Sequence, residues 1–178
     1  RTIKLMDVCR LRNTPIVTFI NKLDRDGLEP VDLLDEVESI LKISCAPITW
    51  PIGMGRAFKG VYHIPENRIY RYESAGRGKA GENATIDGLT SDAALGILGD
   101  DRDAFIEEIE LVRGAMAEFD LDAYLAGDIT PVFFGSALTN FGVRELLDTF
   151  ISYAPSPRAR ETTELPVEPE EKALTGIV

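Results

Sequence analysis

Cysteine and histidine are scarce in this sequence, which narrows the kinds of site that it can form. The 178 residues contain two cysteines and one histidine. Cys9 and Cys45 do not stand at the paired spacing of a zinc site or a disulfide framework, so we expect a reduced, cytoplasmic chain. His63 has no cysteine at metal-ligand spacing, so we expect an ordinary strand histidine and predict no metal ligands.

Positive charge and long apolar runs are also lacking. Lysine and arginine total 19 against 30 aspartates and glutamates, which gives a formal net charge of −11. A chain this acidic is not expected to bind nucleic acid directly through a basic face. No apolar run approaches the roughly 20 residues that span a bilayer, and residues 1–13 lack the apolar segment of a signal peptide, so we expect no membrane contact.

Two parts of the chain combine strand and helix patterns. Residues 16–20 and 129–134 are short apolar runs, each followed by a polar loop and then an amphipathic helix, over 30–43 and 143–153 respectively. The last helix is expected to bury one apolar side, made of Val143, Leu146, Leu147, Phe150 and Ile151. This order is typical of a parallel sheet covered by helices, so we predict that the two strands are neighbours with both polar loops at their carboxyl ends.

The middle of the chain has a different pattern. Residues 48–52, 60–64 and 68–72 are short β-prone segments separated by turn residues, which predicts hairpins and an antiparallel sheet. The spacing of apolar residues further along predicts helices over 103–118 and 120–126. The middle of the chain is therefore predicted to be α+β.

The stretch between these strands and helices is rich in Gly, Asp, Asn and Ser. It covers residues 74–101 and is expected to be loops with little regular structure. It contains Gly-x-Gly-x-x-Gly over 76–81, but no apolar helix follows, so a dinucleotide fingerprint lacks its structural context. We interpret the match as a loop.

Asn-Lys-Leu-Asp follows the first predicted strand, and Asn-Lys-x-Asp is the guanine-specificity motif of GTP-binding proteins. Guanine presents two adjacent donors, the ring N1–H and the exocyclic amine, and the Asp24 carboxylate can accept from both in a bidentate pair. Adenine offers no such pair. Asn21 can bond the edge of the base and brace the neighbouring loop, and Lys22 can lay its methylene stem along the nucleotide. An ordinary polar turn is the alternative interpretation.

Gly-Ser-Ala-Leu follows the second predicted strand, where GTP-binding proteins carry a Ser-Ala-x loop. The backbone N–H of Ala137 would donate to guanine O6, and Ser136 would hydrogen-bond the Asp24 carboxylate and hold its rotamer. The predicted base-binding residues are Asn21, Lys22, Asp24, Ser136, Ala137 and Leu138.

A family resemblance follows from these motifs together with the segments between them. The matching segments are residues 21–26, 46–53, 58–62, 129–138, 140–143 and 154–157. The chain resembles the GTPase domain of the bacterial peptide chain release factor 3 family, which are translational GTPases related to elongation factor G. The resemblance covers nearly the whole chain, and Ile-Thr-Trp-Pro-Ile-Gly over 48–53 favours the release factor over elongation factor G.

The resemblance implies an α/β fold, the C-terminal half of a Ras-like P-loop GTPase domain with an inserted α+β subdomain. Residues 1–45 and 128–154 would form the partial GTPase domain, 46–127 the inserted subdomain, and 155–178 a linker and the start of the next domain. Both ends are expected to continue, because the first helix begins without a capping residue and the last residues read like the opening of a strand.

The resemblance also implies GTP or GDP as cofactor, with the ribosome and class I release factors as partners of the full-length protein. The phosphate-binding loop, both switch segments and the catalytic histidine have no counterpart in this sequence, and Mg²⁺ would be held outside it. We therefore predict no catalytic residues here and no GTP hydrolysis by this piece alone. The alternatives are a fragment of an elongation factor G-type translocase and a docking domain whose Asn-Lys-x-Asp is coincidental.

Overall fold

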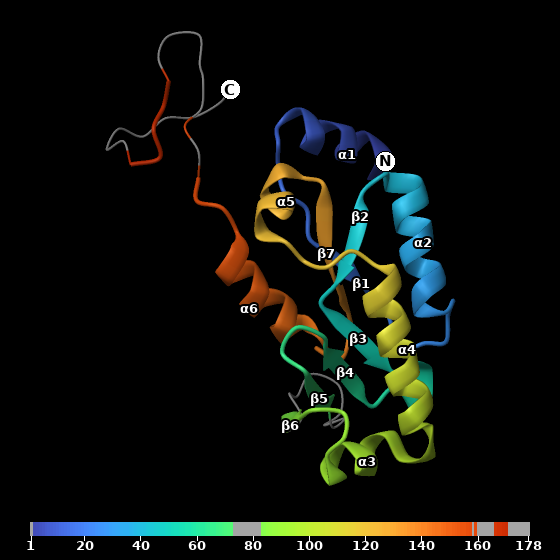
Figure 1. Cartoon of the computed structure of the whole chain (residues 1–178). Coiled ribbons are helices and arrows are strands. Elements are labelled where there is room, and N and C mark those ends of the chain that lie inside the picture. The colour runs from blue at the N-terminus through green and yellow to red at the C-terminus, as the bar shows by residue number, and fades with distance from the viewer. Residues whose placement is uncertain (1, 73–82, 158, 160–165, 171–178) are drawn as a thin grey trace.

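Two sheets and their covering helices make up the molecule (Figure 1). In this view the sheets follow one another along its length. Helices α2 (Pro30–Leu41) and α4 (Arg102–Ala115) lie on one side, and α6 (Val143–Tyr153) lies on the other. The computed structural model describes residues 2–72, 83–157, 159 and 166–170.

The first sheet is parallel and has the order β1 (Thr18–Ile20), β7 (Ile129–Phe134), β2 (Ser44–Pro47). Thr18 lies opposite Val132, so the predicted pairing of these two strands is confirmed. The central strand β7 is buried along its whole length, which suits its nearly continuous apolar run.

Strand β2 was not predicted. The expected helix over 30–43 ends earlier, at Leu41, where Lys42 adopts the left-handed conformation. The next residues, Ser-Cys-Ala-Pro, have little intrinsic β preference, and they form a strand because Ser44 and its neighbours pair in parallel with β7 from Ile129 onward.

Two short helices complete the parallel part. Helix α1 (Thr2–Leu11) is tied to the end of α2, because the guanidinium of Arg10 donates to the carbonyls of Leu41 and Lys42. Helix α5 (Leu121–Ala126) packs against β7 and agrees with the predicted helix over 120–126.

The second sheet is antiparallel and has the order β3 (Thr49–Ile52), β4 (Gly60–His63), β5 (Arg68–Tyr72), β6 (Asn83–Asp87). The three predicted strands and their antiparallel pairing are confirmed. Strand β6 falls in the segment that was expected to be loops, so that prediction is wrong there.

Regular structure continues after β6. Helix α3 (Asp92–Leu98) begins after Ser91, whose side chain accepts a hydrogen bond from the Ala94 backbone N–H. A turn of 3₁₀ helix, η2 (Gly99–Asp101), joins it to α4. The polar composition obscured a helix of seven residues, although Ser91 was a usable capping signal. Residues 74–82, with the Gly-rich match over 76–81, lie outside the described residues.

Helix α6 has the predicted bounds but not the predicted burial. Three residues that were expected to be buried are more than half exposed: Leu147, Phe150 and Ile151. The helical period locates an apolar side but not its partner. The contacts of α6 run instead through Tyr72, which bonds Glu145, and through Phe119, whose ring packs on Tyr153.

One core joins the two sheets. The Trp50 ring, from β3, lies 5.4 Å from the Phe134 ring of β7, and its Nε1 donates to Glu108 of α4 at 2.9 Å. Strand β2, which belongs to the parallel sheet, also extends past residue 45. The division into 1–45 with 128–154 and an insert over 46–127 stays a prediction.

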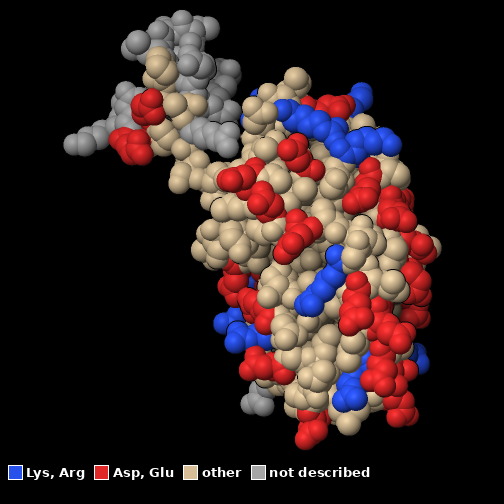
Figure 2. Space-filling model, in the orientation of Figure 1, with Lys and Arg blue, Asp and Glu red and all other residues tan. Residues whose placement is uncertain are grey.

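Acidic side chains run along the side of the molecule that carries α2 and α4, and basic ones gather near α1, on the face that Figure 2 shows. The described part of the chain contains no helix with the length and apolar character needed to cross a membrane.

Candidate functional site

The two polar loops that follow β1 and β7 lie together at the carboxyl ends of these strands. The backbone joins them twice, because the Leu23 N–H donates to the Gly135 carbonyl at 3.1 Å and the Gly135 N–H donates to the Ile20 carbonyl at 3.0 Å. This is the edge where ligands bind on parallel α/β sheets.

Asp24 and Ser136 form the central contact of the site. The Ser136 hydroxyl donates to Asp24 Oδ1 at 2.6 Å, as the sequence predicted. Ser136 is fully buried and Asp24 partly so. A carboxylate can accept several hydrogen bonds, so the second oxygen of Asp24 keeps capacity for a ligand while the first is held by Ser136. Arg25 stands 4.0 Å from that second oxygen.

Asn21 braces the second loop against the first. Its Oδ1 accepts from the backbone N–H of Ala137 at 2.9 Å and from that of Lys22 at 2.8 Å. The predicted bracing by Asn21 is therefore present. The Ala137 N–H, which was expected to donate to guanine O6, is directed to Asn21 in this structure, so a base would have to share or replace that bond.

Lys22 and Leu138 are exposed and stand apart from the central contact. Lys22 has a φ of 74°, a left-handed conformation that is uncommon outside glycine. Leu138 is 58% exposed. The structure thus brings Asn21, Asp24, Ser136 and the Ala137 backbone together, whereas the side chains of the other two predicted residues point to solvent.

The second loop closes tightly behind Ser136. Ser136 and Phe141 exchange two backbone hydrogen bonds, at 2.8 and 3.0 Å. A Cβ on Gly135 would collide with the Phe141 carbonyl oxygen, and Gly142 has a φ of 73° with no room for a Cβ beside the Phe134 carbonyl. Glycine is required at both positions for this close approach.

Sequence reasoning missed the aromatic residues behind this loop. The Phe141 ring stacks on Tyr72 with centroids 4.8 Å apart and planes 11° apart, and Phe58 lies 5.7 Å from Phe141. The Tyr72 hydroxyl donates to Glu145 Oε2 at 2.6 Å. Burial and then the Glu145 charge raise the pKa of Tyr72 far above its usual range. No motif or spacing connects these residues, which come from separate elements.

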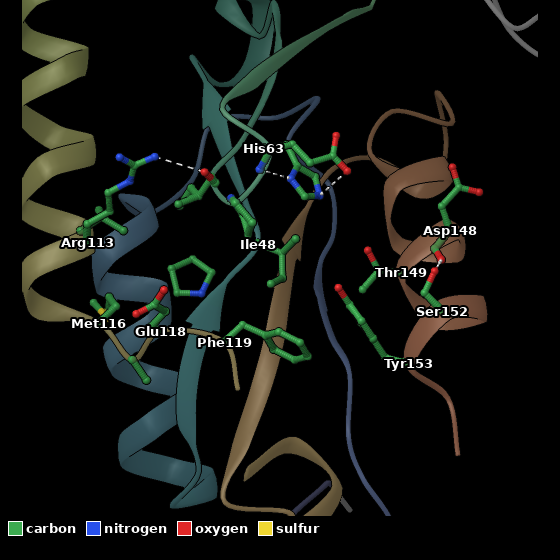
Figure 3. Close-up of a pocket in the computed structure, with 16 residues that line it drawn as sticks. Ile48, His63, Arg113, Met116, Glu118, Phe119, Asp148, Thr149, Ser152 and Tyr153 are labelled. Carbon is green, nitrogen blue, oxygen red and sulfur yellow. Dashed lines mark hydrogen bonds and ion pairs between the residues drawn. The ribbon is translucent and has the colours of Figure 1, made fainter. Parts of the chain in front are cut away.

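A separate cavity of about 600 Å³ lies between the end of α4, the β4–β5 turn and α6 (Figure 3). Its lining includes Ile48, Met116 and Phe119, with His63 and Arg113 beside them, and none of the predicted base-binding residues. Among the described residues, no group of three or more His, Cys, Asp or Glu side chains could hold a metal ion.

The parallel sheet and the paired loops at its carboxyl edge define the α/β fold class of Ras-like P-loop GTPases. Residues 1–156 match the family model described as the elongation factor Tu GTP binding domain. The chain belongs to this family of guanine nucleotide-binding domains of translational GTPases.

One solved structure has the same fold. It is the crystal structure of a protein from Thermus thermophilus, with a TM-score of 0.56 and 20% sequence identity. The match covers 84% of this chain and 24% of that one, so this chain spans about a quarter of the length of that protein.

Proposed function

We propose that the loops following β1 and β7 bind the guanine base of GTP or GDP, as part of a longer translational GTPase. The observation that carries this proposal is the 2.6 Å bond from Ser136 to Asp24. It presets a partly buried carboxylate at the carboxyl edge of the sheet. A carboxylate so placed accepts both adjacent donors of guanine, and a base without them would leave it unpaired.

Asn21 and Ala137 complete the proposed site. The Asn21 side chain already holds the Ala137 amide at 2.9 Å, which places one backbone donor beside the carboxylate. Lys22 and Leu138 would cover the bound nucleotide from the exposed side. The phosphates and Mg²⁺ would be held by parts of the GTPase outside this sequence, since phosphoryl transfer needs a phosphate-binding loop, a metal ion and a residue that positions water.

Replacing Asp24 tests the base assignment. In the longer protein, Asp24→Asn should lower GDP affinity about 100-fold or more, because two charge-assisted hydrogen bonds are lost, and should favour xanthosine diphosphate. Asp26→Asn, an exposed aspartate in the same loop, is the matched control and should keep the preference for GDP. If Asp24→Asn binds both nucleotides as the wild type does, the loops do not read the base.

For the whole protein we propose the release of class I release factors from the cytoplasmic ribosome after peptide release. The resemblance over residues 48–53 supports this over elongation factor G-type translocation. The assay is GTP-dependent dissociation of a class I release factor from post-termination ribosomes, run beside a translocation assay. Activity in the translocation assay alone would assign the second function.

A further inference from the structure

Phe141 connects the proposed guanine site to the rest of the molecule. Its backbone exchanges two hydrogen bonds with Ser136, and the Ser136 hydroxyl donates to Asp24. A shift of Phe141 therefore moves the residue that holds the Asp24 carboxylate. Gly135 and Gly142 leave no spare room around this closure, because a Cβ at either position would meet a backbone carbonyl.

The Phe141 ring rests on residues of the antiparallel part. It stacks on Tyr72, the last residue of β5, with centroids 4.8 Å apart. Phe58, which follows the 3₁₀ turn η1 (Gly55–Ala57), lies 5.7 Å from Phe141 and 6.4 Å from Tyr72. The three rings, called the aromatic stack below, are nearly coplanar in orientation, with planes 11 to 30° apart.

The aromatic stack is fixed at its far side. The Tyr72 hydroxyl donates to Glu145 at 2.6 Å, and the two residues are 7% and 6% exposed. A buried carboxylate without its donor is costly, so Tyr72 has one strongly favoured position. Glu145 lies in the first turn of α6, which begins two residues after Phe141. The ring of Phe141 is thus held by β5 in space and by α6 along the chain.

We propose that Phe141, seated on the aromatic stack, is a positioning residue that sets how well Asp24 discriminates guanine. This inference rests on the proposed function of Asp24. It makes guanine recognition depend on the antiparallel sheet. By thermodynamic linkage, a partner that shifts this sheet changes the affinity for guanine, and a bound nucleotide changes the affinity for that partner by the same factor.

The test compares GDP with inosine diphosphate, which lacks the exocyclic amine and so offers the Asp24 carboxylate one donor instead of two. In the longer protein, Phe141→Leu should lower the GDP-to-IDP affinity ratio by about threefold to tenfold, because a misplaced carboxylate loses part of the second bond. Phe141→Tyr keeps the ring and should restore the ratio. The ratio does not depend on the fraction of protein that is folded, so a loss of stability alone leaves it unchanged.

Two further variants complete the design. Phe58→Leu perturbs the stack from another element and should lower the ratio in the same direction. Phe150→Leu is the matched control, because that ring is 52% exposed on α6, and its ratio should equal that of the wild type. If Phe141→Leu and Phe58→Leu weaken both nucleotides equally, or neither, the stack is structural only and the inference is wrong.

The outcome for Asp24→Asn separates the two levels. A switch toward xanthosine diphosphate together with unchanged ratios in the stack variants overturns this inference and leaves the proposed function standing. An unchanged preference in Asp24→Asn overturns the proposed function itself, and this inference with it.

Discussion

At the scale of single residues, His63 is the buried titratable group that is most sensitive to acid. It ends β4 and is 7% exposed, with Glu66 beside it at 3.8 Å and Arg68 nearby. Burial lowers the pKa of His63 below its usual value of 6.5, Glu66 acts in the opposite direction, and Arg68 adds to the lowering. The folded chain therefore favours the neutral imidazole.

This lowered pKa makes a prediction about stability. Below pH 6.5 the unfolded chain takes up a proton on His63 more readily than the folded chain does, so the stability from the neutral imidazole is present above that pH and is lost as the pH falls through the folded value. His63→Gln should therefore lose less stability than the wild type between about pH 7.5 and pH 5, measured by urea denaturation. Equal losses in both proteins would show that His63 does not contribute, since all carboxylates are common to the two.

Residue patterns predicted one part of the candidate site and could not reach the other. Asn21, Asp24 and Ser136 stand in local motifs after apolar strands, and the geometry of a parallel sheet brings such loops together. Tyr72 and Glu145 meet across 73 residues of sequence, and neither belongs to a motif. Their contact depends on how the antiparallel sheet packs against α6, which local spacing does not encode.

At the scale of elements, helix α6 is held through a polar contact rather than through its apolar side. Glu145 is its buried residue, while Phe150 and Ile151 are 52% and 77% exposed. The bond from Tyr72 to Glu145 therefore has a large share in keeping α6 in place. Removing one partner of a buried hydrogen bond leaves the other unsatisfied.

Tyr72→Phe should accordingly destabilise the chain by about 1–3 kcal/mol, because Glu145 loses its donor. The double variant Tyr72→Phe with Glu145→Leu should regain part of this loss, since no buried carboxylate remains unpaired. Urea denaturation measures both. Tyr153→Phe, at the more exposed end of the same helix, is the matched control and should stay within about 0.5 kcal/mol of the wild type. A Tyr72→Phe variant as stable as this control would contradict the account.

Elements with a clear period were predicted, and elements made by pairing alone were missed. The strands β1, β3 and β7 carry apolar β-rich runs, and α6 has a strong helical period. Strand β2 forms because a neighbour offers it a free edge, and β6 forms because it extends the antiparallel sheet beyond β5. Propensity is a weak guide for such strands, since packing and pairing decide them.

At the scale of the whole molecule, the two sheets share a core and a charge pattern. Leu34 of α2, Trp50 of β3 and Ile109 of α4 belong to one buried cluster, so the parallel and antiparallel parts support each other. Acidic side chains dominate the face shown in Figure 2, in line with the formal charge of −11. The molecule thus places a preset carboxylate at a sheet edge and ties it rigidly to its second sheet.

The most direct test of the central claim is the crystal structure of the longer protein bound to GDP. The account predicts that the Asp24 carboxylate accepts from N1–H and from the exocyclic amine of guanine, with Ser136 still donating to Asp24. It also predicts that the Ala137 N–H turns from Asn21 toward guanine O6. Guanine bound away from these loops, with the Asn21–Ala137 bond unchanged, would contradict it.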